Sequence, residues 1–237
     1  SNEAPAIQRR SACQKKPPVP PIPPIPPVIW REPRCSLSGG LLPSRIAMVF
    51  RISPRQGSSP SSAIFWSAGK ASLAEYQYKR LKQIFERVYL SAKEAALFDH
   101  VNATVIEDET GKEVYAPTAG FVNAFRYLKD DNMIFVMSVD TPFVNQAIID
   151  ECVTLADHHY DAIIIRTPGG THPLCGLYSR SLEKPLMSML HKGDHKLSRL
   201  LDNAKVHYID VDDEEALLNM NTPEDYQKAL KILEKKK

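Results

Sequence analysis

One apolar run constrains the fold of this chain more than any other feature of its sequence. Residues 133–139 read Met-Ile-Phe-Val-Met-Ser-Val, so an extended segment here carries apolar side chains on both of its faces. Strands covered on both faces belong to the interior of parallel sheets, whereas a strand with one face in water alternates apolar and polar residues. We therefore predict a strand over Met133–Val139 in the middle of a parallel sheet.

The sequence after Lys70 alternates between short β-prone runs and longer amphipathic segments. The further predicted strands are 88–90, 104–106, 162–166, 175–179 and 206–210, and the predicted helices are 72–85, 120–128, 145–157, 182–190, 196–203 and 223–236. This alternation predicts an α/β protein with a doubly wound, mainly parallel sheet. Ligands of such sheets bind beyond the carboxyl ends of the strands, so the functional residues are expected there.

Residues 1–70 differ from the remainder in charge and in proline content. They hold ten Lys and Arg against two Asp and Glu, together with thirteen of the nineteen prolines, whereas residues 71–237 hold twenty against twenty-six. A proline removes an N–H donor and disfavours the α region for the residue before it, so we expect no interior strand or helix in this segment. Its basic charge would suit nucleic acid or an acidic partner. No aromatic residues are interleaved with the charges, so a tail or a sequence artefact is the favoured interpretation.

The remaining composition predicts a cytoplasmic protein. The four cysteines, at 13, 35, 152 and 175, form no CxxC pair, which argues against a structural zinc site or a disulfide scaffold and fits a reducing compartment. No apolar run approaches the roughly 18–20 residues of a membrane span. The N-terminus lacks the order of regions that marks a signal peptide. We expect neither a membrane nor a nucleic acid as partner.

Asp140 is the strongest candidate for chemistry. It follows the predicted central strand directly, in Ser-Val-Asp-Thr-Pro, where the strand end aims its carboxylate into the crevice. A carboxylate there suits Mg²⁺ bridging the phosphates of a nucleotide, because Mg²⁺ takes one or two carboxylates and leaves its other positions to phosphate and water. The alternative is that Asp140 caps the helix that begins near Asn145.

Three further segments are weaker candidates. Asn219 and Asn221 are two residues apart, so in an extended segment both amides would point the same way, toward a ligand. The residues after them form a helix-capping signal with Thr222 as the N-cap. His172 follows a flexible Gly-Gly-Thr loop, and taken alone a structural role suits it better than a catalytic one. The turn Ala116–Gly120 opens a helix with small residues, which either lets a flat base approach the backbone or is an ordinary helix start.

Together these segments resemble the molybdenum cofactor guanylyltransferases. The match runs in order through Val105–Asp108, Ala116–Gly120, Val139–Pro142, His172–Pro173 and Asn219–Asp225. Each motif is weak alone, but the series is fairly specific and covers the chain from about Ala71 to Lys237. The resemblance implies that residues 71–237 form a nucleotidyltransferase domain with the Rossmann-like sheet of the nucleotide-diphospho-sugar transferases. The implied reaction joins GMP from GTP to molybdopterin-bound molybdenum and releases pyrophosphate.

On the nucleotide side, the resemblance implies that Asp140 binds Mg²⁺ and acts in catalysis. It assigns guanine or ribose contacts to Asp108 and to the turn from Pro117 to Gly120. The nucleophile in such a transfer is already a phosphate, so no strong base is needed. Positioning and charge neutralisation then supply most of the rate.

On the acceptor side, the resemblance implies that Asn219, Asn221 and His172 contact the pterin, with Asn221 also acting in catalysis. The expected small-molecule partners are GTP and molybdopterin. Contacts with proteins that insert molybdenum or mature molybdoenzymes are a further expectation.

The sequence departs from the family in several places. Ala116 and Thr118 stand where the family usually has Gly and Leu, and Lys93 stands where it has Asn. The family also opens with a strand, then Leu-Ala-Gly-Gly-x-Ser-x-Arg, then Asp-Lys-Ala-Leu, and its glycine loop wraps the triphosphate with backbone N–H groups. The segment of this chain most similar to that loop is Leu-Ser-Gly-Gly at 37–40, so Gly39 and Gly40 are candidate nucleotide-binding residues. No Asp-Lys-Ala-Leu sequence follows it.

A shift of reading frame would supply both missing motifs. Residues 37–40 can be encoded CTT AGC GGG GGG, and the next codon can begin with C. When the reading frame moves forward by one base, the same nucleotides read TTA GCG GGG GGC, which encodes Leu-Ala-Gly-Gly. Residues 55–60 can be encoded AGA CAA GGC TCT TCT CCC, which reads Asp-Lys-Ala-Leu-Leu in the same phase. We therefore interpret residues 1–70 as a frame-shifted or divergent stand-in for the first strand and phosphate loop. The alternative is a genuine proline-rich extension.

Two other functions are open from the sequence. A cytidylyl- or sugar-nucleotide transferase would use the same sheet, and only His172-Pro173 and the segment Asn219–Asp225 favour the guanylyltransferase over it. The other alternative is a binding protein that has the nucleotidyltransferase fold but is catalytically inactive, because the sequence lacks the triphosphate loop.

Overall fold

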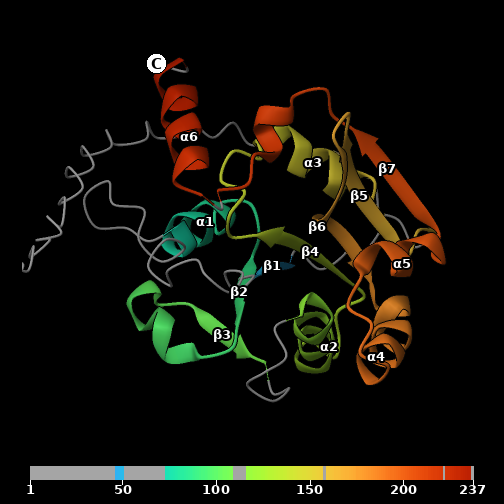
Figure 1. Ribbon diagram of the computed structural model, residues 1–237. Helices are drawn as coiled ribbons and strands as arrows, with labels where there is room; N and C mark the ends of the chain where they lie inside the picture. Colours follow the sequence, from blue (N-terminus) through green and yellow to red (C-terminus); the bar gives the residue numbers. More distant parts are fainter. Residues whose placement is uncertain (1–45, 51–72, 109–115, 157–158, 221, 236–237) are drawn as a thin grey trace, which may run out of the picture.

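The computed structural model describes residues 46–50, 73–108, 116–156, 159–220 and 222–235, which form one sheet with helices on both faces (Figure 1). The strands are β1 (Ile46–Phe50), β2 (Arg87–Ala92), β3 (Thr104–Glu107), β4 (Met133–Ser138), β5 (Ala162–Thr167), β6 (Gly170–Ser179) and β7 (Val206–Asp210). The α-helices are α1 (Leu73–Leu81), α2 (Pro117–Tyr127), α3 (Gln146–Thr154), α4 (Glu183–His191), α5 (Leu197–Asp202) and α6 (Pro223–Lys235). Three short 3₁₀ helices are η1 (Ala95–Val101), η2 (Arg180–Leu182) and η3 (Glu214–Leu217).

Over the described residues the sheet has seven strands, in the order β3-β2-β1-β4-β6-β5-β7. The pairs β3–β2, β2–β1, β1–β4 and β5–β7 are parallel, and β6 runs antiparallel to both β4 and β5. The doubly wound, mainly parallel sheet predicted from the alternation of elements is therefore confirmed. Because every described strand except β6 points the same way, their carboxyl ends meet at one edge of the sheet, which we call the carboxyl edge.

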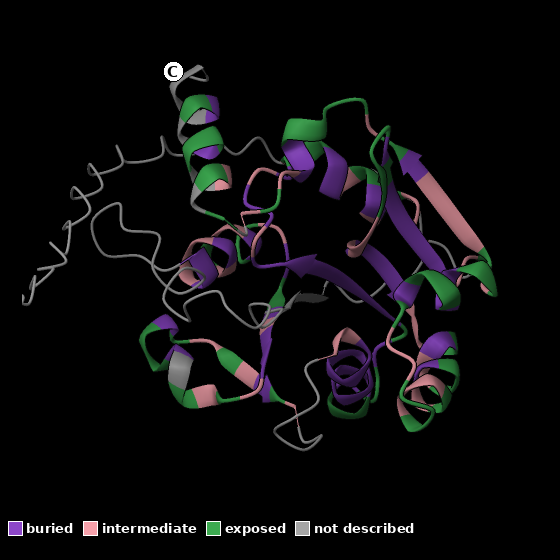
Figure 2. Cartoon of the chain, viewed as in Figure 1, coloured by how far each residue is buried: buried purple, intermediate pink, exposed green. Residues whose placement is uncertain are grey.

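Strand β4 is the centre of the molecule, and all six of its residues are buried. Figure 2 shows β4 in the colour of buried residues. Its alternate side chains enter two separate apolar layers. One layer includes residues of α1 and α3 and holds Phe135, whose ring stacks on Phe85 with centroids 5.2 Å apart. The other includes residues of α2 and α4 and holds Ile134, beside an edge-to-face pair of Phe121 and Tyr178 at 4.5 Å. The predicted central strand is confirmed, although one of its two neighbours is the antiparallel β6.

The expectation that residues 1–70 supply no interior strand is wrong. Strand β1 pairs in parallel with β2 on one side and with β4 on the other, so it is an interior strand of the sheet. The run Ile46–Phe50 is apolar and lies between Pro43 and Pro54, neither of which interrupts it. A proline excludes a strand only at and next to its own position. The prediction failed because it used the proline content of all seventy residues, whereas these five residues contain no proline.

Other boundaries differ from prediction by a few residues. The first helix ends at Leu81, and β6 begins at Gly170 rather than at Cys175, because the Gly-Gly-Thr segment continues the β5–β6 hairpin instead of forming a loop. At the start of α6 the backbone N–H of Asp225 donates to Thr222 Oγ1 and that of Thr222 donates to Asp225 Oδ2, both at 3.1 Å. This reciprocal pair confirms the predicted cap. None of the helices described is long and apolar enough to cross a membrane.

A β-bulge in β6 depends on one glycine. Ile164 of β5 lies opposite Gly176, and the next residue, Ile165, lies opposite His172, so residues 173–175 bulge out of the ladder with β5. Gly176 has φ +158°, and a Cβ there would lie 2.1 Å from the backbone oxygen of Ile163. Backbone cannot yield as a flexible side chain can, so the bulge requires glycine.

Gly176→Ala should therefore lower the free energy of unfolding by more than about 2 kcal/mol. Gly193→Ala is the matched control, because Gly193 has φ +66° but a Cβ added there would meet no atom within 4 Å. It should cost only about 1 kcal/mol of αL strain. Urea denaturation measures both values, and equal losses would contradict the assigned role of Gly176.

Candidate functional site

Asp140 lies at the carboxyl edge, in the turn of residues 138–144 that follows β4. Its carboxylate accepts a hydrogen bond from Ser138 Oγ, and its backbone oxygen accepts one from the N–H of Met220 at 2.9 Å. The α3 N-cap is Asn145, whose side chain accepts from the N–H of Ile148 at 3.0 Å. The alternative in which Asp140 caps that helix is therefore excluded.

Burial raises the pKa of Asp140, and the hydrogen bond from Ser138 opposes this shift only in part. A carboxylate that burial destabilises is stabilised again by a nearby cation. Within the described ranges no three His, Cys, Asp or Glu side chains converge on a metal position, so Asp140 is not part of a closed cluster of such ligands there. The donor set suits Mg²⁺, which binds through one or two carboxylates and completes its octahedron with water and phosphate.

The segment that carries the candidate asparagines lies against the Asp140 turn. The hydrogen bond between Met220 and Asp140 joins two parts of the chain that are eighty residues apart in sequence. Asn219 is exposed beside this contact, so its amide is accessible to a ligand. Asn221 lies outside the described residues, and its role stays a prediction.

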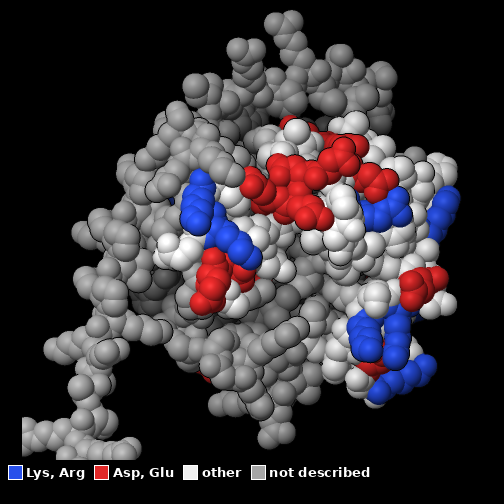
Figure 3. All heavy atoms as spheres, turned by 45° about the horizontal axis from the view of Figure 1, so that its top comes forward, with Lys and Arg blue, Asp and Glu red and all other residues white. Residues whose placement is uncertain are grey.

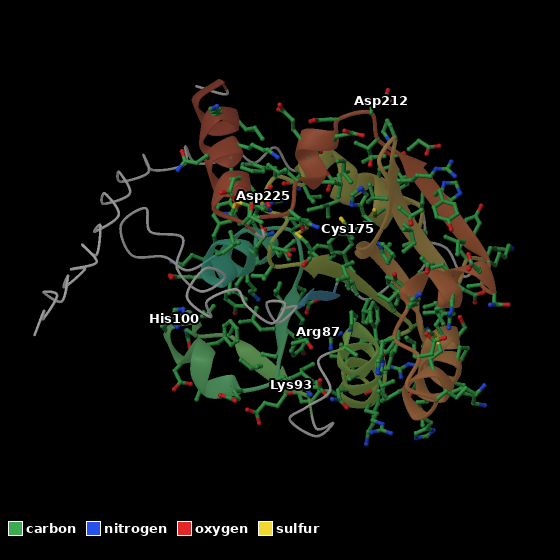
Figure 4. The ribbon with its side chains drawn as sticks, viewed as in Figure 1. Arg87, Lys93, His100, Cys175, Asp212 and Asp225 are labelled. Atoms are coloured by element: carbon green, nitrogen blue, oxygen red, sulfur yellow. The ribbon has the colours of Figure 1, made fainter. Side chains whose placement is uncertain are left out.

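Asp108 is held in a three-membered polar cluster at the carboxyl ends of β2 and β3. Its Oδ2 forms a salt bridge with Lys93 Nζ at 3.0 Å, and its Oδ1 accepts from Asn123 Nδ2 at 3.2 Å. Asn123 belongs to α2 and also approaches the backbone oxygen of Glu107 at 3.4 Å. The Lys93 and Asp108 side chains are only 16% and 8% exposed, so the charges are largely shielded from water. Figure 4 labels Lys93, just past the end of β2.

The first turn of α2 is held from another part of the chain. Thr118 is fully buried, and its Oγ1 lies 2.8 Å from Nδ1 of His195, in the connection between α4 and α5. Pro117, at the first helical position, is half-buried, whereas Gly120 is buried. A ligand would therefore meet this turn at Pro117 rather than at Gly120.

His172 lies at the same edge but is engaged by its own hairpin. Its Nε2 is 3.0 Å from Thr167 Oγ1, and burial lowers its pKa while Glu214 opposes the shift. Exposed acidic residues gather around η3 nearby, namely Asp212, Asp213, Glu214 and Glu215 (Figure 3). This negative charge disfavours an anionic ligand at His172, and the hydrogen bond with Thr167 fits the structural role that the sequence favoured for this residue.

Several site residues were not predicted as such from the sequence. Lys93 stood out only as a departure from the family, and Asn123, Thr118 and His195 were not singled out for their contacts. A buried Asn in the apolar run Phe-Val-Asn-Ala-Phe was an available signal, because a buried amide needs partners. Nothing in the sequence joins Thr118 to His195. Gly39 and Gly40 lie outside the described residues, and they precede β1, whereas the glycine loop of the resemblance follows its strand.

Comparison with known proteins decides the family. Residues 53–208 match the family model described as MobA-like NTP transferase domain. The chain belongs to this family. A molybdenum cofactor guanylyltransferase of Campylobacter jejuni is 32% identical over 176 residues, covering 74% of this chain and 89% of that protein. One of Helicobacter pylori is 33% identical over 162 residues, covering 68% and 74%. The family predicted from the motif series is therefore confirmed.

Solved structures show the same fold. The molybdopterin-guanine dinucleotide biosynthesis protein A of Archaeoglobus fulgidus superposes with a TM-score of 0.66 at 20% identity, covering 80% of this chain and 99% of that one. A CMP:2-keto-3-deoxy-manno-octonic acid synthetase complexed with CTP gives 0.64 at 11% identity, covering 82% and 100%. The predicted sheet of the nucleotide-diphospho-sugar transferase type is confirmed for this MobA-like protein.

Asn123→Leu should destabilise the MobA-like protein by about 1–3 kcal/mol, because Asp108 Oδ1 and the Glu107 carbonyl each lose a donor in a shielded place. Arg126→Gln, on the exposed face of the same helix, is the control and should stay within about 0.5 kcal/mol. Chemical denaturation at neutral pH measures both. An Asn123→Leu protein as stable as the control would show that the amide does not hold the cluster.

Proposed function

We propose that this MobA-like protein transfers GMP from GTP to molybdopterin-bound molybdenum, releasing pyrophosphate and forming the guanine dinucleotide cofactor. The observation that carries the proposal is the contact between the Asp140 turn and the Asn219–Met220 segment. It brings the candidate metal ligand and the candidate acceptor segment to one place, in a chain whose relatives are named for this activity. A cytoplasmic location is part of the same proposal.

The proposed chemistry needs alignment more than proton transfer. A phosphate oxygen of the acceptor attacks the α-phosphorus of GTP, and the bond from that phosphorus to the β-phosphate oxygen breaks. The acceptor phosphate is already ionised, so the residues are required to hold the two substrates in line. Asp140 would hold Mg²⁺, whose positive charge would stabilise the departing pyrophosphate.

The nucleotide end of the proposed site is the region between the Lys93–Asp108–Asn123 cluster and the first turn of α2. Both carboxylate oxygens of Asp108 already have donors, so Asp108 meets the guanine or ribose as part of this cluster rather than as a free carboxylate. Lys93 adds a positive charge beside it. Pro117, Gly120, Gly39 and Gly40 are assigned to the nucleotide by the resemblance alone.

The acceptor end is assigned to Asn219 and Asn221. Asn219 is exposed next to the Asp140 turn, and amide groups can donate to phosphate and accept from the pterin ring. His172 joins them only through the resemblance, because its hydrogen bond to Thr167 and the acidic residues near it suit an anionic acceptor poorly.

Nucleotide binding tests the proposal. A thermal shift with GTP, CTP or ATP, each with Mg²⁺, should show the largest stabilisation with GTP, since a ligand at 100 times its dissociation constant adds about 2.7 kcal/mol. A larger shift with CTP would favour a cytidylyltransferase. No shift with any nucleotide would favour a fold that has lost nucleotide binding.

Asp140→Asn should lower the rate of GMP transfer by a factor on the order of 10² or more, because the neutral amide is a poor Mg²⁺ ligand and positioned charge carries most of the rate. The fold should persist, since the change removes a charge that burial disfavours. Asp202→Asn, at an exposed position of α5, is the control and should leave the rate unchanged. Pyrophosphate release measures the rates, and near-normal turnover by Asp140→Asn would exclude Asp140 as the metal ligand.

A further inference from the structure

Helix α1 sends two side chains to the turn that carries Asp140. Gln77 is fully buried, and its Nε2 donates to the backbone oxygen of Thr141 at 2.9 Å and approaches that of Ser138 at 3.4 Å. Arg80, one helical turn later, donates from Nη1 to the backbone oxygen of Pro142 at 2.8 Å and from Nη2 to that of Val144. These contacts lie on both sides of Asp140 in sequence.

The two side chains also contact each other. Arg80 Nη1 lies 3.3 Å from Gln77 Oε1, so the amide is oriented with its NH₂ group toward the turn. Gln77 and Arg80 are three residues apart, which places them on the same face of the helix. We call them the Gln77–Arg80 pair.

The arrangement depends on the chemical identity of both residues. The planar guanidinium presents several N–H groups in a fixed fork, and it uses them here on two carbonyls and one amide oxygen. A lysine keeps the charge but offers a single point of donation. The Gln77 amide likewise donates to the backbone oxygens of Thr141 and Ser138, and a buried carbonyl oxygen needs such a donor.

The turn is also fixed from its other side. Thr141 Oγ1 donates to the Ser138 oxygen at 3.0 Å, and the Met220 N–H donates to the Asp140 oxygen at 2.9 Å. Any displacement of the turn relative to α1 therefore displaces Asp140 and the attachment point of the acceptor segment together. Transfer requires the reacting atoms to be aligned, and a misplacement of about 1 Å can cost roughly 10²-fold in rate.

We propose that Gln77 and Arg80 are positioning residues for nucleotidyl transfer, which fix the Asp140 turn and, through Met220, the acceptor segment relative to α1 and the sheet. This inference rests on the proposed function. In this role the two residues act through the backbone of residues 138–144, whose carbonyl oxygens their side chains contact. A purely structural role predicts lower stability but an unchanged rate in the folded fraction.

The test compares Arg80→Lys and Gln77→Met with the wild type and with a matched control on the same helix. Lys79→Gln is the control, because the Lys79 side chain is 69% exposed and its ion pair among the described residues is with Glu75 on the same helix. The readouts are the kcat of GMP transfer, the KM for GTP, the half-saturating Mg²⁺ concentration and the affinity for Mn²⁺ with GTP by electron paramagnetic resonance. All are measured at a temperature where denaturation curves show the protein folded.

Arg80→Lys and Gln77→Met should each lower kcat at least tenfold and weaken Mn²⁺ binding at least threefold, with a change of less than twofold in the KM for GTP. Lys79→Gln should match the wild type. Having two variants keeps the test decisive if one of them fails to fold. A folded variant of either residue with wild-type kcat and Mn²⁺ affinity overturns the proposal.

The outcome also separates this inference from the proposed function. If the wild type binds Mn²⁺ with GTP but transfers no GMP, the proposed reaction fails, and weaker Mn²⁺ binding by the two variants still supports the positioning of Asp140. If the wild type transfers GMP and both folded variants do so equally well, the reaction stands and the positioning role fails.

Discussion

Burial of β4 on both faces is the constraint on which the rest of the structure depends. A strand that is apolar on both sides requires a cover on each, and α1 with α3 and α2 with α4 supply these covers. It also requires neighbours on both edges, which are β1 and β6. The carboxyl end of β4 is then fixed in the middle of the sheet, and the first polar side chains after it must face the carboxyl edge. Asp140 occupies that position.

The candidate site is built mainly from contacts between backbone and distant side chains. Gln77 and Arg80 reach the Asp140 turn from α1, and Met220 reaches it from the segment before α6. On the proposed nucleotide side, α2 holds Asp108 through Asn123 and is itself held through Thr118 by His195. Each candidate segment is thus tied to an element far away in the sequence. An enzyme that works by aligning two phosphorylated substrates needs this kind of rigidity.

The sequence predicted well those features that depend on local patterns. The apolar run at 133–139, the alternation of strands and helices, the cap at Thr222 and the position of Asp140 after the central strand were all confirmed, because each follows from neighbouring residues. Strand β1 was missed because the proline content of a long segment outweighed a short window without proline. The start of β6 was missed because Gly-Gly-Thr is typical of a loop, whereas here Gly170 and Thr171 pair with β5 as part of a hairpin. The partners of Asp140, Asp108 and Thr118 could not be predicted, since they are side chains and backbone groups brought together only by the folded sheet.

The most direct test of this account is the formation of product from both substrates. Purified protein is incubated with GTP labelled at the α-phosphate, Mg²⁺ and molybdenum-loaded molybdopterin, and the labelled dinucleotide and pyrophosphate are quantified. We expect equal amounts of both products, each dependent on both substrates, with GTP used in preference to CTP. Dinucleotide formed mainly from CTP, or no dinucleotide from folded protein, would contradict it.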